Sequence, residues 1–546
     1  MSLRRSPSPQ VAATRSEPTG TPDASAVNRR QLLRGAGAGI AFFVAGPTLL
    51  EACGGGASSG SAGKAPVKGG ILVVSDLTEP PALDPVKYNS HTIEVVYRQV
   101  TEQLYQWTDQ KTIVPLLAAS MPAISADGLT YTVKLRQGVT FHNGKAFDSS
   151  DVKYSYEQMQ NPKNGSIWLP GVQFIKSIDT PDPATAVITL SQVFTPLISK
   201  LALLPIVPSN VPYNATVYAR SLIGTGPYKF VSWQQGTQLV LKKNKAYWDT
   251  GVPETDGITF QFTTSEATRV AAVASGSANL VYQLDPHDVS VLKSRGVSVS
   301  VLENSSQLNY MYPNLSAGKA TADVNLRQAI AWAIDRKAII SQVFAGYAVP
   351  DATLPANGAQ YYDTAIGQSI SLDLAKAQSY LKAAGGPPKS PLSLVVLASP
   401  TAPAVTTIVQ ENLAKIGINT DVTVLQIAPA LQKLFTGDYD LFFLDVLYQE
   451  STGFAGDIAY LATTPGAFSN FNHANDKQLY KLALHAVSVP DGPEAQAAWR
   501  AVQQRWVEYL PQINLVTSRV ICATSHLQVT LSSMADLHEL KTATLT

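Results

Sequence analysis

Helical and strand patterns alternate along the second half of this chain, and the alternation restricts the fold more than any other feature. After Asp323, apolar residues recur at helical spacing at Leu326, Ile330 and Ile334. Similar patterns predict helices at 372–384, 405–415 and 493–510 and strands at 392–397, 421–425, 440–444 and 513–516. Because helices that alternate with strands cover the faces of a sheet, the pattern predicts an α/β fold.

The first half carries strand patterns separated by turn residues. Strands are predicted at 71–74, 129–135, 238–242 and 257–262, and a helix opens at 147–152 with Ser149 or Ser150 as its N-cap. The second region closes with the helix at 493–510, and the strand near 513–516 still has to be placed. We therefore expect two α/β regions, the first of which resumes near the C-terminus.

The bulk composition is that of a globular protein. The chain has 546 residues, 45% hydrophobic and 15% charged, which is enough for a large core and more than one domain. A formal net charge of +1 gives no reason to expect a nucleic-acid partner. Of the two cysteines, Cys522 lies in the apolar run Val520–Ala523, where we expect a buried, unreactive thiol.

The N-terminal segment has the features of an export signal. Residues 1–27 are rich in Ser, Pro, Thr and Ala, and we expect them to be disordered. Arg29 and Arg30, followed by Leu32 and Leu33, resemble a bacterial twin-arginine signal. The apolar stretch at 35–50 is interrupted by glycines and is shorter than the roughly 20 residues of a membrane-spanning helix.

A candidate lipid anchor follows this stretch. Leu50 to Cys53 resembles a bacterial lipobox, although Glu51 replaces the usual small residue. A Gly- and Ser-rich segment at 54–68 comes next and would span roughly 20 Å as a flexible tether. We expect lipid on Cys53 to hold the protein at the outer face of the cytoplasmic membrane, or in the periplasm if the cell has an outer membrane. The alternative is a cleaved signal or a retained anchor helix.

Motifs for catalysis or metal binding are missing from the sequence. The only G-x-S-x-G match, at 56–60, falls in the tether, where no strand–turn–helix can present a serine. No phosphate-binding loop and no H-E-x-x-H motif is present, and the seven histidines occur singly. We therefore expect no catalytic residue, no metal and no cofactor, and the chain is not predicted to be an enzyme.

Several segments resemble one known family when they are taken in order. They are Asp84–Pro85, Asp127–Phe147, Asp151–Ser155, Gly224–Tyr228, Asn244–Trp248 and Leu326–Arg336. Together they resemble the extracytoplasmic solute-binding proteins (family 5) that serve ABC importers of oligopeptides, dipeptides and nickel. The resemblance runs from about residue 69 to residue 529.

The resemblance implies a two-lobed type II periplasmic-binding-protein fold with a ligand cleft between the lobes. The signal segment would then be 1–52 and the lipidated tether 53–68. Lobe I would be discontinuous, with residues 69–306, an extra subdomain near 100–176 and a return at 514–546, and lobe II would be 307–513. The hinge is expected near 307–312 and near 511–516, and ligand would be enclosed when the lobes close.

The resemblance also suggests where ligand is bound. Peptide binders of the family often carry Trp and then Asp after the strand that here begins Tyr439–Asp440, and the Asp pairs with the peptide amine. In this chain Val446 falls at the Trp position and Gln449 at the Asp position, so recognition of ordinary peptides is in question. The candidate contacts are Glu79, Gln283, Asp285, Tyr310, Tyr312, Tyr448, Gln449 and Glu450.

The predicted function is that of the substrate-binding component of an ABC importer. It would capture peptides or similar polar solutes outside the cytoplasmic membrane and deliver them to the permease subunits, and we expect a monomer. Three alternatives remain open at this point. They are a sensor or adhesion lipoprotein on the same fold, a binder of a non-peptide ligand such as an oligosaccharide, a nickel chelate or haem, and an extracellular hydrolase.

Overall fold

One mixed sheet organises the part of the chain that the structure describes. The computed structural model describes residues 67–88, 91–108, 112–447, 470–531 and 540–546, all within the unit Gly63–Thr546. Eleven strands of these ranges form the sheet, in the order β15-β14-β16-β12-β17-β11-β1-β10-β9-β8, and β13 pairs with β17. Its strands are β1 (Ile71–Asp76), β8 (Tyr228–Gln234), β9 (Gln238–Lys243), β10 (Gly257–Phe262), β11 (Leu280–Val281), β12 (Ser298–Pro313), β13 (Ala348–Pro350), β14 (Leu392–Leu397), β15 (Thr420–Leu425), β16 (Leu441–Leu447) and β17 (Ile513–Thr524).

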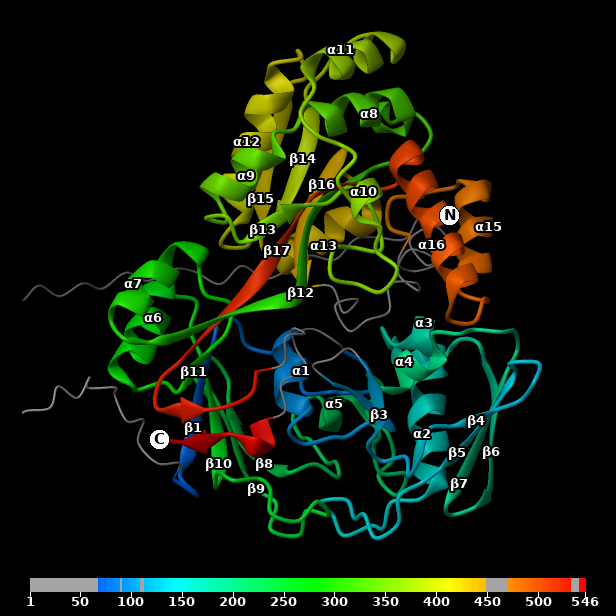
Figure 1. Cartoon of the computed structure of the whole chain (residues 1–546), viewed down its shortest axis with the longest axis vertical. Helices are drawn as coiled ribbons and strands as arrows, with labels where there is room; N and C mark the ends of the chain where they lie inside the picture. The colour runs from blue at the N-terminus through cyan, green and yellow to red at the C-terminus, as the bar shows by residue number, and fades with distance from the viewer. Residues whose placement is uncertain (1–66, 89–90, 109–111, 448–469, 532–539) are drawn as a thin grey trace, which may run out of the picture. The chain divides into compact units, whose positions relative to one another are not determined.

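The two longest strands of this sheet, β12 and β17, join its two groups of parallel strands. They pair antiparallel from Ser298–Thr524 to Met311–Ile513, with register shifts before Gln307 and after Asn309. Figure 1 shows them crossing between the upper and lower groups of elements side by side. β12 continues the sheet to β16, and β17 continues it to β11. The predicted strand at 513–516 is therefore only the first third of β17.

Parallel pairing gives each group of strands a common direction. In one group β1 lies between β10 and β11 and is parallel to both, and in the other β14 lies between β15 and β16 and is parallel to both. Such strands are covered on both faces, which explains why β14 is apolar from Leu392 to Leu397 except at Ser393. The carboxyl ends within each group consequently meet at one edge.

Helices supply the cover. The described helices are α1 (His91–Tyr97), α2 (Ser149–Gln160), α3 (Leu169–Val172), α4 (Leu197–Leu201), α5 (Ala215–Tyr218), α6 (Glu266–Ser275), α7 (Val289–Ser294), α8 (Val324–Ala333), α9 (Arg336–Gln342), α10 (Thr364–Gly367), α11 (Leu374–Ala383), α12 (Ala402–Ala414), α13 (Ile427–Thr436), α15 (Lys477–Ala486) and α16 (Pro493–Tyr509). One core packs Ile330 of α8 and Leu381 of α11 against Leu394, Phe443 and Leu515 of the sheet. Among the described residues, no helix is both long and apolar enough to cross a membrane.

Three small sheets stand apart from the main one. The largest has the order β4-β5-β7-β6 and packs beside α2. The strands are β2 (Tyr105–Trp107), β3 (Ile113–Pro115), β4 (Ala123–Ile124), β5 (Thr130–Lys134), β6 (Ile175–Asp182), β7 (Thr185–Leu190), β18 (Leu527–Gln528) and β19 (Thr544–Leu545). The lobe and subdomain boundaries expected from the sequence stay predictions.

The helix starts illustrate one confirmed prediction and one that is wrong. The helix predicted after Asp323 is present as α8, and Asp323 is its N-cap, with a side chain that accepts from the amide of Asn325. For α2, however, the cap is Asp148 and not Ser149 or Ser150. Asp148 accepts from the Ser150 amide, and the carboxylate of Asp151 accepts in turn from the Asp148 amide. This reciprocal arrangement satisfies free amides at both positions, which neither serine achieves.

Two glycines allow a close approach between the start of β8 and the turn after α1. A Cβ at Gly224 would lie 2.1 Å from the Val100 carbonyl oxygen, and one at Gly226 would lie 2.8 Å from the Val100 carbonyl carbon. The Gly226 amide donates to that same oxygen at 2.9 Å. Space next to another backbone, and not a turn conformation, therefore requires glycine at both positions.

Replacing Gly224 should destabilise the protein strongly. Gly224→Ala forces backbone against backbone, so we expect the free energy of unfolding, measured in urea, to fall by about 3 kcal/mol. Gly171→Ala is the matched control, since its Cβ would meet only the flexible side chain of Lys200 at 3.5 Å. Equal effects of the two changes would contradict the packing argument.

Candidate functional site

The carboxyl ends of parallel strands from both groups border one cavity of about 260 Å³. Leu77 follows β1, Thr264 follows β10, and Gln283 to Pro286 follow β11, while Thr401 follows β14. In open α/β sheets, ligands bind in the crevice outside the carboxyl ends of the strands. The topology of the sheet therefore makes this cavity the candidate ligand site.

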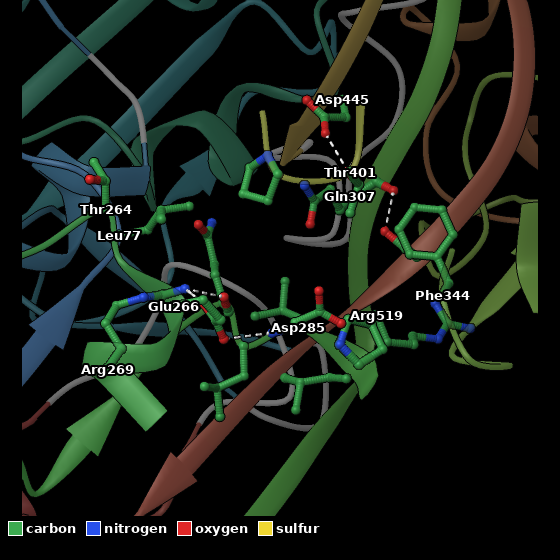
Figure 2. Close-up of a pocket in the computed structure, with 17 residues that line it drawn as sticks. Leu77, Thr264, Glu266, Arg269, Asp285, Gln307, Phe344, Thr401, Asp445 and Arg519 are labelled. Carbon is green, nitrogen blue, oxygen red and sulfur yellow. Dashed lines mark hydrogen bonds and ion pairs between the residues drawn. The ribbon is translucent and has the colours of Figure 1, made fainter. Parts of the chain in front are cut away.

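The two joining strands form the remaining wall of the cavity. Gln307 of β12 and Arg519 of β17 line it, together with Phe344 that follows α9. Figure 2 shows Thr264, Leu77, Glu266 and Arg269 on one side and Asp445 and Thr401 on another. The cavity is thus bordered by side chains from both groups of strands and from the strands that connect them.

Asp445, on β16, is a carboxylate in an otherwise apolar strand. Its Oδ2 accepts a hydrogen bond from Thr401 Oγ1 at 2.8 Å and another from the Ser399 hydroxyl. Burial raises the pKa of Asp445 above the ordinary aspartate value, and the two hydroxyl donors only partly oppose this. Among the described residues no cationic side chain forms an ion pair with it, so a cation entering the cavity would stabilise its charged form.

The two arginines of the cavity wall already have partners. Arg269 is fully buried and forms an ion pair with Glu266. Arg519 donates from Nη2 to the side-chain oxygen of Asn357 at 2.8 Å, and its Nε lies 3.8 Å from Glu303. Positive charge is therefore compensated in the wall, whereas the charge of Asp445 is not.

A buried carboxylate behind the wall holds β17 in place. Asp351 has no exposed surface, and its Oδ2 accepts from Thr517 Oγ1 and from the Asn357 amide, both at 2.7 Å. Asn514 of β17 donates to the Thr353 carbonyl at 2.7 Å. Burial raises the pKa of Asp351 to about 7. The loop at 351–357 therefore holds β17 through side-chain hydrogen bonds next to Arg519.

The structure brings two of the sequence-predicted contacts into the cavity wall, Gln283 and Asp285. It places others elsewhere. Glu79 accepts from Trp233 Nε1 at 2.6 Å and from the Gly236 amide at 2.9 Å, beside the β8–β9 turn. Tyr310 and Tyr312 are buried with ring centroids 5.0 Å apart, and neither lines the cavity.

The other predicted site residues lie outside the described residues. They are Tyr448, Gln449 and Glu450 of the predicted ligand loop, Arg29 and Arg30 of the export signal, and the lipidation candidate Cys53. Cys522, in contrast, is described, and it is a buried free cysteine. No group of three or more His, Cys, Asp or Glu side chains suited to a metal ion occurs within the described ranges.

Sequence reasoning missed Asp445, Thr401, Glu266 and Arg269. A signal existed for Asp445, because it is the one charged residue within the apolar run Leu441–Leu447. Glu266 and Arg269 carried no such signal, since an acid and a base three positions apart on a helix are typical of an exposed surface.

The fold and the cavity together define the class of protein. A mixed α/β structure with two groups of parallel strands facing one cavity is that of the type II periplasmic binding proteins. Residues 112–462 match the family model of bacterial extracellular solute-binding proteins, family 5 (Middle). The chain belongs to this family, and it is the substrate-binding component of an ABC importer. The family consists of transport binding proteins and not of enzymes.

Individual relatives differ in the ligand that their names give. The glutathione-binding protein GsiB of Pectobacterium atrosepticum is 29% identical over 457 residues, 81% of this chain and 88% of GsiB. DppA of Helicobacter pylori, in complex with the peptide STSA, has a TM-score of 0.77 at 22% identity and covers 88% of this chain and 98% of its own. AgaA from A. tumefaciens R10, in complex with agropinic acid, has a TM-score of 0.77 at 26% identity and covers 87% and 99%.

Asp351 should make stability depend on pH. Its folded-state pKa of about 7 lies above the ordinary value, so folding favours the protonated form, and the stability this contributes is lost as pH rises from about 4 to about 7. In Asp351→Asn this loss is absent. Across this window the free energy of unfolding of the wild type, measured in urea titrations, should therefore fall relative to that of the variant. The expected fall is on the order of 1 kcal/mol per pH unit. A difference that does not change with pH would contradict the assignment.

Proposed function

We propose that this importer component captures small solutes that carry a protonated amino group, with short peptides as the principal class. The observation that supports the proposal is Asp445, a partly buried carboxylate that meets two hydroxyls and no cation among the described residues. A desolvated carboxylate gains most from a cationic partner with hydrogen-bond donors, and an ammonium group has both properties. The cavity volume, about 260 Å³, is slightly below the range of about 300–1,000 Å³ that is usual for ligand pockets, so it suits a small solute.

Capture would operate by closure of two lobes around the ligand. Asp445 and Thr401 belong to the group of strands around β14, and Gln283 and Asp285 follow β11 in the other group. A ligand that contacts both groups binds more tightly when they approach each other, so it shifts the population toward the closed form. In this proposal lobe I is 69–306 with 514–546, lobe II is 307–513, and β12 and β17 act as the hinge of a monomer.

The ligands of two relatives agree with this class. Glutathione, named for GsiB, and the peptide STSA bound to DppA both carry a free amino group. The agropinic acid of AgaA shows that the same fold also accepts a different compound. The amino group is therefore argued from the Asp445 carboxylate of this chain, and the relatives only support it.

Blocking the amino group should abolish high-affinity binding. We expect trialanine or glutathione to bind, and the N-acetylated form of the same peptide to bind at least about 30-fold more weakly, because a buried charge then lacks its partner. Asp445→Asn should cause a similar loss for the free peptide without lowering the melting temperature. Isothermal titration calorimetry measures both effects.

The control for this variant is Asp421→Asn, which changes an exposed aspartate of β15 that does not line the cavity. Binding should also weaken as pH falls, since protonation of Asp445 removes the charge that the ammonium group requires. Equal affinities for the free and the acetylated peptide would refute the proposed ligand class.

We also propose that lipid on Cys53 anchors the protein to the outer face of the cytoplasmic membrane. The support is the lipobox-like Leu50–Cys53 and the Gly- and Ser-rich segment after it. In the native host, Cys53→Ser should move the protein from the membrane fraction to the soluble fraction. Cys522→Ala is the matched control, since that thiol is buried, and it should leave fractionation unchanged. Retention of the Cys53→Ser protein on membranes would place the anchor elsewhere.

A further inference from the structure

The loop after β11 has an unusual backbone where it borders the cavity. Gln283 to Pro286 all line the cavity, and Gln283 has a φ of +52°, in the left-handed region. A residue with a Cβ pays roughly 1–2 kcal/mol for this conformation, which glycine adopts freely. Such a residue persists where the surroundings determine its backbone and its side chain has a use.

The side chain of Arg269, on α6, holds the backbone of this loop through hydrogen bonds. It is fully buried, and its Nη1 donates to the Tyr282 carbonyl at 2.7 Å while its Nη2 donates to the Gln283 carbonyl at 3.1 Å. One planar guanidinium thus holds two consecutive carbonyls, a geometry that the single ammonium of lysine does not reproduce.

Glu266 completes the arrangement one helical turn earlier. One carboxylate oxygen pairs with Arg269, and the other accepts from the Asp285 amide at 3.0 Å. The Leu284 amide donates to the Ile521 carbonyl of β17 at 3.0 Å. Figure 2 shows Glu266 between Arg269 and Asp285, with the interactions dashed. The pair therefore contacts three backbone groups across Tyr282–Asp285.

We propose that the Glu266–Arg269 pair is a positioning device for this loop and that Gln283, which it holds in the left-handed conformation, is a specificity-determining residue. The side-chain amide of Gln283 has both a donor and an acceptor. It can therefore donate to the carbonyl of a ligand's peptide group and accept from its N–H. This inference rests on the proposed capture of amino-bearing peptides, and it assigns the recognition of their backbone to the wall opposite Asp445.

The first test isolates the side chain of Gln283. Gln283→Gly removes the amide and relieves the backbone strain, so the melting temperature should stay the same or rise. Affinity for trialanine, measured by calorimetry, should nevertheless fall at least tenfold. Unchanged affinity in this variant would overturn the specificity role.

The second test measures the backbone of the loop in the free protein. In Arg269→Lys, hydrogen–deuterium exchange of the segment 282–288 should be at least tenfold faster. Trialanine should also bind this variant more weakly. Glu266→Gln is the second variant, should Arg269→Lys fail to fold, and it should accelerate exchange in the same segment. Unchanged exchange in a folded variant would overturn the positioning role.

Arg505→Lys is the matched control. Arg505 also pairs with a glutamate three positions away, but it lies on α16 and does not line the cavity. It should leave exchange at 282–288 and affinity unchanged, and an equal effect of this control would overturn the inference. If the wild-type protein binds no free-amine peptide, the proposed function and the role of Gln283 both fail, while exchange still decides the role of Arg269.

Discussion

The antiparallel pairing of β12 with β17 is the constraint on which the rest of the structure depends. Each of these strands is hydrogen-bonded to its partner along most of its length, and each continues the sheet into a different group of parallel strands. The pair therefore fixes how the strand ends of both groups meet. The register shifts near Gln307 and Asn309 fall where the two strands pass the cavity, and such irregularities bend and twist a strand locally.

Buried charge follows a common rule around this pair. The partly buried carboxylate of Asp445 and the fully buried one of Asp351 accept from neutral hydroxyls and amides, whereas the buried arginines Arg269 and Arg336 donate to carbonyls. Burial raises the pKa of each aspartate, and the neutral donors, which stabilise the charged form, oppose this rise only in part. At Asp351 the consequence is structural, because the group is closed off from solvent. At Asp445 the group lines a cavity, and in the proposed function its uncompensated charge binds the amino group of the ligand.

Much of the fold could be predicted from the sequence, and the failures have physical causes. The strand at 392–397 and the helix after Asp323 follow from local patterns, because the apolar spacing that marks each lies within a few residues. β17 was predicted too short, since Thr517, Ser518 and Arg519 interrupt its apolar run. Thr517 and Arg519 find their partners in a loop more than 150 positions away, and Ser518 finds its partners in β12, so no local pattern carries that information.

The candidate site was predicted less well than the fold for the same reason. Gln283 and Asp285 line the cavity, but Asp445 and Arg269 acquire their roles only when distant strands and helices come together. The expected ligand contacts of Tyr310, Tyr312 and Glu79 stay predictions.

The β12–β17 pairing also determines how long one strand waits for its partner during synthesis. Met311 pairs with Ile513, 202 positions later in the chain (513 − 311). At bacterial elongation rates of about 5–20 residues per second, β12 emerges from the ribosome roughly 10–40 seconds before this partner exists. β16, whose Leu444 pairs with Tyr310, appears earlier and can cover one edge, but the other edge must wait. An open strand edge invites pairing with other chains, so the nascent protein passes through an interval in which it depends on protection from aggregation until nearly the whole chain has been made.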